Sequence, residues 1–304
     1  MGTNEKTLIV CVTGASGLIG NKIVEKLLRH GYKIRVFTRR PYFKKRVDTF
    51  RGCITDKNKM RNFLDKADIV IHCAAELKNE QEMWKTNVLG TKILVELVQE
   101  NNNIKYFCYL SSAGVIGKAN KIVVDEYTQC NPENIYEKTK YEAERVVSEK
   151  LLDCKKIILR PTNVVGSNVL GNYKYFQEQS LFGWLKTFLI GAECCHVVHC
   201  EDVAEAAIYF ITHKNNTNSD IFIVSLDDEK NNNIANLWRL YREQMGLMKI
   251  PVLHLPLKAT YIFRKVLGKK NNSGMHFYTS KKISCAGFEY KYNIESIVRS
   301  IYIK

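Results

Sequence analysis

The sequence lacks the features that mark several classes of protein. It has no C-x-x-C pair and no set of cysteines and histidines at zinc-finger spacing. No apolar run approaches the roughly 18 residues of a membrane-spanning helix, and no signal-peptide core precedes the first predicted strand. The ten cysteines are too dilute for a disulfide scaffold, and several lie inside apolar runs. We therefore expect free thiols, a cytoplasmic location and no transmembrane segment.

The chain carries an excess of positive charge that is concentrated at its two ends. The formal net charge is +15, of which residues 1–50 and residues 251–304 hold +8 each. Such an excess suits nucleic acid, phosphorylated small molecules or an anionic membrane surface. Because no helix-turn-helix, zinc-finger or RRM signature accompanies the charge, we expect no nucleic-acid partner.

Short apolar runs alternate with segments of helical periodicity through the first two-thirds of the chain. The predicted strands are 7–12, 33–38, a short one near 52–54, 67–75, 104–112, 156–161 and 220–225, and the predicted helices are 21–30, 56–66, 84–100, 136–152 and 202–213. Apolar strands separated by helices indicate βαβ units and a parallel sheet covered on both faces. We predict an α/β fold, a Rossmann-type doubly wound parallel sheet with a smaller C-terminal substrate-binding lobe. The core takes residues 1–166 and 196–225, and the lobe takes 167–195 and 226–304.

A glycine-rich turn follows the first predicted strand. Three glycines are spaced G-x-x-G-x-x-G, and a predicted helix begins directly after them. Glycines let the backbone approach a pyrophosphate, and the helix N-terminus supplies N–H groups and a positive dipole. The residues expected to bind a cofactor here are Gly14, Ser16, Gly17, Leu18, Ile19 and Gly20.

Tyr136 and Lys140 form a Y-x-x-x-K pair at the head of a predicted helix, one turn apart on the same face. An ammonium beside a phenol favours the phenolate, so we expect the pKa of Tyr136 to fall from about 10 toward neutrality. The phenol can then exchange a proton with an alcohol or a carbonyl. Ser112 ends a predicted strand, and such a hydroxyl points into the crevice where α/β sheets bind ligands.

These motifs, in this order, resemble the extended short-chain dehydrogenases/reductases, the NAD-dependent epimerase/dehydratase family. The resemblance covers nearly the whole chain and is nearest to bacterial nucleotide-sugar 4-reductases and epimerases. Further segments that resemble the family are HCAA at 72–75, TNVLGT at 86–91, SSAGVIG at 111–117, the approach to the helix at 125–144, RPTNVVG at 160–166, VVHCEDVAEA at 197–206 and AGFEYKYNIES at 286–296.

The resemblance implies a role for each matching residue. Tyr136 is the implied general acid/base, Lys140 lowers its pKa and holds the nicotinamide ribose, and Ser112 hydrogen-bonds the reacting oxygen of the substrate. The side chain of Asn163 is implied to face the substrate. The remaining implied cofactor contacts are Ile54, Asp56, Ala74, Ala75, Asn87, Pro161, Asn163 and Val164. No metal ligand is implied.

Arg39 and Arg40 follow the second predicted strand, where an acidic residue would accept the adenosine ribose and repel a 2′-phosphate. Arginine binds phosphate by bidentate, charge-assisted hydrogen bonds. We therefore expect NADP, with NAD as the alternative. Cys53 stands where the family usually has an aspartate for the adenine, and backbone at Ile54 or the carboxylate of Asp56 is the possible substitute.

The reaction indicated is 4-keto reduction or 4-epimerisation of a nucleotide-diphospho-sugar, in surface-polysaccharide biosynthesis. A dehydratase is disfavoured because Ala113 and Gly114 follow Ser112 where dehydratases have acidic residues. The basic groups considered for the substrate diphosphate are Lys174, Lys186 and Arg264.

Two other functions stay open. The first is a 3β-hydroxysteroid or dihydroflavonol-type dehydrogenase with an apolar pocket from Phe176, Phe182, Trp184 and Phe188. The second is a non-catalytic, nucleotide-sensing family member. The resemblance also implies a homodimer that pairs through the helices at 84–100 and 136–152. Residues 257–267 could form a basic amphipathic helix, so peripheral membrane contact is a further possibility.

Overall fold

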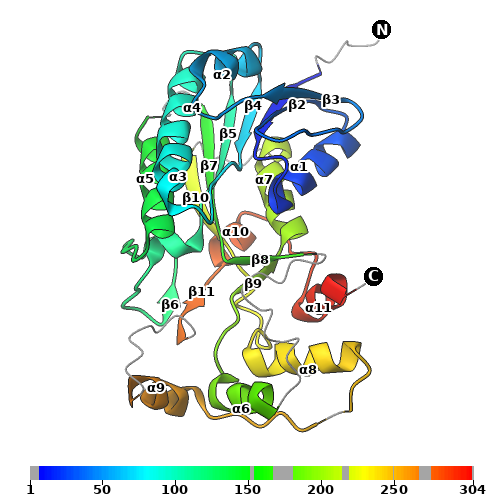
Figure 1. Ribbon diagram of the computed structural model, residues 1–304, viewed down its shortest axis with the longest axis vertical. Coiled ribbons are helices and arrows are strands. Elements are labelled where there is room, and N and C mark those ends of the chain that lie inside the picture. The colour runs from blue at the N-terminus through cyan, green and yellow to red at the C-terminus, as the bar shows by residue number, and fades with distance from the viewer. Residues whose placement is uncertain are drawn as a thin grey trace. The chain divides into compact units, whose positions relative to one another are not determined.

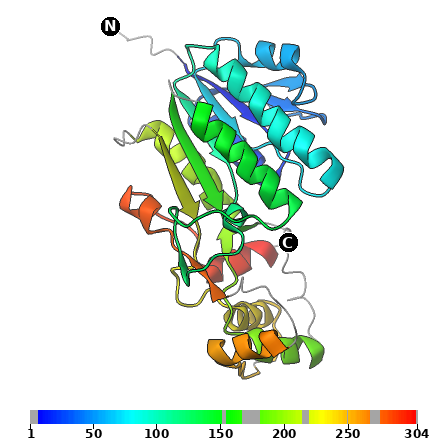
Figure 2. The same ribbon diagram turned by 90° about the vertical axis from the view of Figure 1, so that its left-hand side faces the viewer.

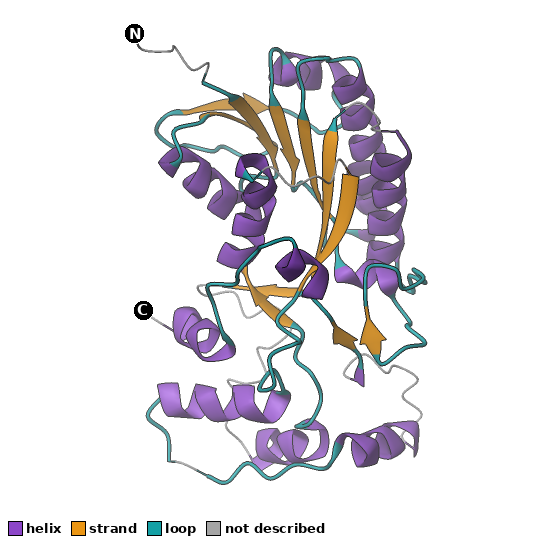
Figure 3. Ribbon diagram, turned by 180° about the vertical axis from the view of Figure 1, so that it is seen from behind, coloured by secondary structure: helices purple, strands orange, loops and turns teal. Residues whose placement is uncertain are grey.

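The computed structural model describes residues 7–150, 154–166, 181–213, 219–248, 250–266 and 275–302. The chain forms a seven-stranded sheet with the order β10-β7-β5-β4-β1-β2-β3 (Figures 1 and 3). The strands are β1 (Ile9–Thr13), β2 (Lys33–Thr38), β3 (Val47–Arg51), β4 (Ile69–His72), β5 (Tyr106–Leu110), β7 (Lys155–Pro161) and β10 (Ser219–Val224). Every neighbouring pair whose register is described runs parallel. The strand order reverses at β1, which lies between β2 and β4.

Helices cover both faces of this sheet, as the apolar strands require (Figure 1). The helices are α1 (Leu18–Arg29), α2 (Lys57–Leu64), α3 (Glu80–Met83), the π-helix η1 (Trp84–Leu89), α4 (Gly90–Gln99), α5 (Ile135–Lys150) and α7 (Cys200–Thr212). Apolar side chains of α2, α4 and α5 share one buried core with the strands. An ion pair between Lys26 and Glu205, 2.9 Å long, joins α1 to α7 on the other face. The predicted doubly wound Rossmann-type sheet is confirmed.

Contacts divide the chain into two compact units. The first contains 1–115, 132–160 and 203–222, and the second contains 116–131, 161–202 and 223–304. The second unit has two short parallel pairs, β6 (Val123–Val124) with β11 (Phe277–Tyr278) and β8 (Asn163–Val165) with β9 (Val197–His199). Its helices are α6 (Leu181–Ile190), α8 (Ile234–Gln244), α9 (Leu257–Val266), α10 (Lys281–Cys285) and α11 (Ile294–Tyr302), and the short 3-10 helix η2 (Ala113–Ile116) spans the boundary. Trp238 of α8 and Ile297 of α11 are buried in its core.

Two predicted elements differ from the structure. The strand expected near 52–54 is β3 at Val47–Arg51, an edge strand with β2 as its sheet neighbour. Its side chains are half-buried or exposed, so it carries no continuous apolar run to recognise. The helix expected over 84–100 begins with the π-turns of η1 before α4 starts.

The ten cysteines are free thiols. Within the described residues, no helix combines the length and apolarity needed to cross a membrane.

Candidate active site

The glycine turn between β1 and α1 lies at the carboxyl edge of the sheet, beside the strand-order reversal. Gly14 has a φ of 72°, and a Cβ there would lie 2.6 Å from the backbone nitrogen of Ala74. A Cβ on Gly20 would lie 2.3 Å from the Gly14 oxygen. Both positions therefore exclude any side chain.

The N-terminus of α1 is open to an anion. Gly17 is its N-cap and supplies no side-chain cap, and no acidic residue occupies the first turn. Ser16 and Gly17 are exposed. Free N–H groups at the start of a 12-residue helix suit a pyrophosphate, so this turn fits the predicted dinucleotide.

His72 joins the elements beneath the turn. Its Nδ1 lies 2.6 Å from Thr13 Oγ1 and its Nε2 lies 2.9 Å from Thr91 Oγ1. The backbone N–H of Ala74 also donates to Thr13 Oγ1, at 3.3 Å. Burial, with a smaller effect of Lys140, lowers the pKa of His72 to about 3, so the ring is neutral. His72 thus fixes the loop of Ala74 and Ala75 to β1 and α4 and takes no direct part in proton transfer.

Asn87 lies on the π-helix with its amide fully engaged. Its Oδ1 accepts from the Glu76 N–H at 2.7 Å, and its Nδ2 donates to the Glu76 carbonyl and to Thr139 Oγ1, both at 3.1 Å. The side chain is buried and links the loop after β4 to α5. π-helical turns often occur at functional sites. The sequence motif alone did not predict these hydrogen bonds of Asn87.

The residues expected around the adenine have other partners. Asp56 caps α2 by accepting the Lys59 N–H at 3.1 Å, and Ile54 is buried against Gly90 of α4. Cys53 is exposed, and its Sγ lies 3.1 Å from Thr55 Oγ1. The hydrogen bonds with Thr55 lower the pKa of the Cys53 thiol.

Arg39 and Arg40 are exposed after β2, as expected. Arg39 Nη2 lies 3.2 Å from Glu76 Oε2, and Glu76 Oε1 accepts the backbone N–H groups of residues 77–79 at 3.2, 3.2 and 3.3 Å. These backbone hydrogen bonds, with that to Lys78 foremost, lower the pKa of Glu76. The Glu76 carboxylate therefore occupies a cradle of N–H donors that includes the arginine.

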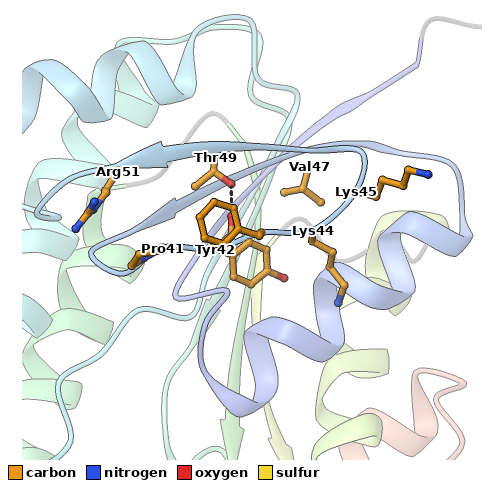
Figure 4. A pocket seen from close by; sticks show the side chains of 8 residues that line it. Pro41, Tyr42, Lys44, Lys45, Val47, Thr49 and Arg51 are labelled. Atoms are coloured by element: carbon orange, nitrogen blue, oxygen red, sulfur yellow. Dashed lines mark hydrogen bonds between the residues drawn. The ribbon is translucent and has the colours of Figure 1, made fainter.

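The basic segment between β2 and β3 lines a surface hollow (Figure 4). Its lining is Pro41, Tyr42, Phe43, Lys44, Lys45, Val47, Thr49 and Arg51. Lys44 Nζ bonds Asn21 Oδ1 at 3.2 Å and Glu25 Oε1 at 3.0 Å, and the Tyr42 hydroxyl donates to the same Asn21 oxygen at 3.1 Å. Part of the N-terminal positive charge thus fastens this segment to α1.

Ser112 and Tyr136 come together in the first unit. Ser112 follows β5 and accepts the Gly114 N–H on its Oγ at 3.1 Å. Burial raises the pKa of Tyr136, the Ser112 hydroxyl opposes this rise, and Glu137 adds a smaller rise. The expected fall in this pKa is therefore absent from the structure.

The reason lies in the surroundings of Lys140. Its Nζ donates to the Leu110 carbonyl at 2.6 Å and lies 4.2 Å from the centre of the Tyr109 ring. Burial lowers the pKa of Lys140 to about 7, with Cys73 and Glu144 opposing the shift. An ammonium that buried is readily discharged, and its electrostatic effect on the phenol is correspondingly weak.

A buried ion pair that the motifs did not indicate joins Glu144 of α5 to Arg160 of β7. Ser111 Oγ donates to Glu144 Oε2 at 2.6 Å, and Arg160 lies 2.5 Å from Glu144 Oε1 through Nη2 and 3.1 Å from Oε2 through Nε. All three side chains are buried. The signal that the sequence offers for this network is the position of Glu144, four residues after Lys140 and therefore on the same face of α5.

The remaining predicted residues belong to the second unit. The Asn163 N–H donates to the His196 carbonyl at 2.7 Å, and its side-chain Nδ2 donates to the Cys195 carbonyl at 3.2 Å. Pro161 is buried and Val164 is half-buried. Lys174 and Phe176 lie outside the described residues. Arg264 is engaged by Glu193, with two contacts of 2.6 Å.

Three potential metal ligands, Cys194, His196 and Asp227, are buried within 4.8 Å of one another in the second unit. Asp227 already accepts hydrogen bonds from His196 Nδ1 at 2.5 Å, the Tyr278 N–H at 2.9 Å and Asn232 Nδ2 at 3.2 Å. Donors that satisfy a buried carboxylate explain the cluster without an ion.

The Rossmann-type sheet and the open glycine turn fit a dinucleotide-binding fold, and Ser112, Tyr136 and Lys140 are the candidate catalytic residues beside them. A profile of the NAD dependent epimerase/dehydratase family matches residues 10–225. The chain belongs to this family, which confirms the resemblance read from the motifs.

Three curated proteins illustrate what this sequence is similar to. The chain is 30% identical to the uncharacterised protein y4nG of Sinorhizobium fredii over 68% of its own length and 56% of that protein, so the match spans little more than half of it. A bifunctional dihydroflavonol 4-reductase/flavanone 4-reductase of Pyrus communis is 26% identical over 98% of this chain and 90% of its own. A putative UDP-glucose 4-epimerase of Methanocaldococcus jannaschii is 26% identical over 78% and 83%, respectively.

A solved structure shows the same fold. The Bordetella bronchiseptica enzyme WbmG in complex with NAD superposes with a TM-score of 0.75 and 18% identity, covering 99% of this chain and 94% of that one.

Proposed function

We propose that the protein is an NAD(P)-dependent oxidoreductase that acts on a nucleotide-diphospho-sugar by 4-keto reduction or 4-epimerisation. The observation that carries this proposal is the open N-terminus of α1 at the sheet edge where Ser112 follows β5. Tyr136 and Lys140 lie one turn apart on α5, and the Ser112 hydroxyl lowers the pKa of Tyr136 against the effect of burial.

The side chains present suit proton transfer to a carbonyl. A bound nicotinamide supplies or accepts the hydride. Tyr136, whose pKa is raised by burial, stays protonated at neutral pH and can donate its phenolic proton to the substrate oxygen. Ser112 Oγ can hydrogen-bond that same oxygen.

NADP is the proposed cofactor, with NAD as the alternative. The exposed guanidinium groups of Arg39 and Arg40 support it, because they follow β2 where an acidic residue would repel a 2′-phosphate. Fluorescence titration with NADPH and NADH tests this choice. We expect NADPH to bind more tightly and Arg39→Asp to abolish the preference. Tighter NADH binding that Arg39→Asp leaves unchanged would contradict it.

The reaction is tested with NADPH and a panel of 4-keto nucleotide-sugars, following the loss of reduced cofactor. We expect turnover with a member of the panel, and a decrease of about 100-fold or more with Tyr136→Phe. Tyr141→Phe, on the same helix, is the matched control. Turnover that survives Tyr136→Phe would refute the mechanism.

A dehydrogenase or reductase of an apolar alcohol is the second candidate. The similarity to the pear dihydroflavonol reductase over 98% of this chain supports it. Dihydroflavonols and 3β-hydroxysteroids belong in the same panel, and turnover of these alone would replace the sugar substrate. A non-catalytic sensor is disfavoured because the Ser112–Tyr136–Lys140 set is complete.

We further propose a homodimer, a role in surface-polysaccharide biosynthesis and a cytoplasmic location. Figure 2 shows α4 and α5 side by side, and η1, which continues directly into α4, packs against α5. Trp84 and Leu89 on η1 are 47% and 46% exposed, which leaves apolar area for a second copy. Ten free thiols suit a reducing compartment. Substrate binding by the C-terminal lobe, with its boundaries at residues 166 and 225, is part of the same proposal.

A further inference from the structure

We propose that helices α6 and α9 of the second unit form a docking face for an anionic lipid bilayer. The docking face is defined here as Leu181, Phe182, Leu185, Lys258, Ile262 and Val266. This inference goes beyond the proposed function and does not depend on it.

Helix α9 turns an apolar stripe outward. Lys258, Ile262 and Val266 are spaced four residues apart and therefore share one face. Ile262 is 63% exposed and Val266 is 79% exposed. The opposite side packs inward, because the buried Thr260 donates its hydroxyl to the Leu189 carbonyl of α6 at 3.0 Å. The stripe is thus the side of α9 that its own packing leaves to solvent.

Helix α6 repeats this arrangement. Gly183 and Thr187 are buried on its inner side. Leu181, Phe182 and Leu185 are 81%, 65% and 46% exposed on the other. The two helices pack against each other within the second unit (Figures 1 and 2). Large apolar side chains exposed together, and not singly, mark an interaction surface.

The charge of this region is of one sign. Residues 181–192 and 250–266 contain no aspartate or glutamate, but contain Lys186, Lys258, Arg264 and Lys265. The nearest acidic residue in sequence, Glu193, is buried and paired with Arg264. Neither helix therefore adds an exposed acidic side chain to the docking face, and the exposed Lys258 gives it a positive charge.

A lipid surface fits this combination better than a second copy of the chain. An interface between two identical faces would bring the lysines of both copies together and repel. In a bilayer, the apolar side chains enter the boundary between headgroups and acyl chains, and the exposed Lys258 extends toward anionic phosphates. Charge complementarity thus selects the anionic membrane.

The test is co-sedimentation of the full chain with vesicles of phosphatidylcholine and phosphatidylglycerol, and with vesicles of phosphatidylcholine alone. We expect binding to the anionic vesicles at low salt and weaker binding at high salt. Phe182→Glu combined with Ile262→Glu should lower the partition coefficient at least about tenfold. Lys258→Ala should lower it about fivefold.

Ile122→Glu is the matched control, because Ile122 is 70% exposed in the same unit but lies on neither helix. It should bind vesicles as the wild type does. Thermal melting checks that each variant is folded. Absence of wild-type binding to anionic vesicles at low salt would overturn the proposal, as would an equal loss in Ile122→Glu. A self-association that Phe182→Glu abolishes, without vesicle binding, would assign the face to a second copy instead.

Discussion

At the scale of single residues, Glu76 forms an ion pair with the Arg39 guanidinium, the group that we propose binds a cofactor phosphate. Its carboxylate accepts three backbone N–H groups and the guanidinium. A 2′-phosphate would have to compete with this carboxylate for the arginine. The Arg39 side chain is 55% exposed, so water and salt weaken its ion pair with Glu76 and the competition with a phosphate is modest.

Glu76→Gln should therefore tighten NADPH binding by about two- to fivefold and leave NADH binding nearly unchanged. The amide keeps a hydrogen-bond acceptor for the backbone but releases the guanidinium. Glu80→Gln, which removes a carboxylate from the first turn of α3, is the control. Isothermal titration with both cofactors measures the effect, and equal tightening for NADH would rule out competition for the phosphate site.

Lys140 makes stability depend on pH. Its folded pKa, about 7, is below the ordinary value of 10.5 because of burial. The unfolded chain therefore binds the proton more strongly, so the destabilising effect of this lysine is complete below about pH 7 and fades as the pH rises toward 10.5. Lys140→Met should accordingly gain thermal stability relative to the wild type on going from alkaline to mildly acidic pH.

Melting curves of Lys140→Met and the wild type at several pH values test this sign. Lys138→Met is the control, since Lys138 is exposed on the same helix. Lys140→Met should also lose turnover, whereas Lys138→Met should keep it. A stability difference that does not change with pH would mean that Lys140 is not the titrating group.

At the scale of elements, the buried ion pair of Glu144 and Arg160 connects α5 to β7. Ser111, at the end of β5, donates to the same carboxylate. Three elements that carry or flank Ser112, Tyr136 and Lys140 are thus held by one buried group. Removing one partner of such a pair leaves a desolvated charge, whereas replacing both with apolar side chains is often tolerated.

Glu144→Gln should reduce the free energy of unfolding by about 3 kcal/mol, and the double variant Glu144→Leu with Arg160→Met should recover most of that loss. Urea denaturation measures both. Glu142→Gln, an exposed position on the same helix, should change stability by no more than about 0.5 kcal/mol. If the double variant were less stable than Glu144→Gln, the pair would be stabilising in itself.

Asn87 shows how the helix that carries a residue determines the partners of its side chain. Its place in the TNVLGT segment predicted a cofactor contact. The π-turns of η1 direct its amide to Glu76 and Thr139 instead, so it positions the loop that carries Ala74 and Ala75. Its contact with the cofactor itself stays a prediction.

At the scale of the whole molecule, the homodimer is testable through Trp84. If two copies pair through η1, α4 and α5, a charge at this half-exposed aromatic should separate them. Trp84→Glu should halve the mass measured by light scattering. Tyr127→Glu, at an 81% exposed aromatic that is on none of these helices, is the control. A wild-type monomer, or a dimer that Trp84→Glu leaves intact, would contradict this interface.

The order of strands and helices and the motif residues could be predicted because their signals are local. An apolar run marks a buried strand, and three glycines before a helix mark a tight turn near a helix dipole. β3 escaped because an edge strand has no continuous apolar run. The pKa of Tyr136 was predicted in the wrong direction because burial, which spacing does not reveal, raises it, and Lys140 is not among the groups that shift it.

The sequence by itself determined the parallel sheet, the glycine turn and the Ser112–Tyr136–Lys140 set, and with them the family. The tertiary structure decided what the remaining charges do. Glu76 meets Arg39 across 37 residues and Ser111 meets Glu144 across 33, and neither contact has a local signal. Part of the N-terminal positive charge fastens the segment after β2 to α1, while part of the C-terminal charge surrounds exposed apolar side chains on α6 and α9. Which side chains are desolvated and which charges are neutralised depends on three-dimensional packing, so only the folded chain settles it.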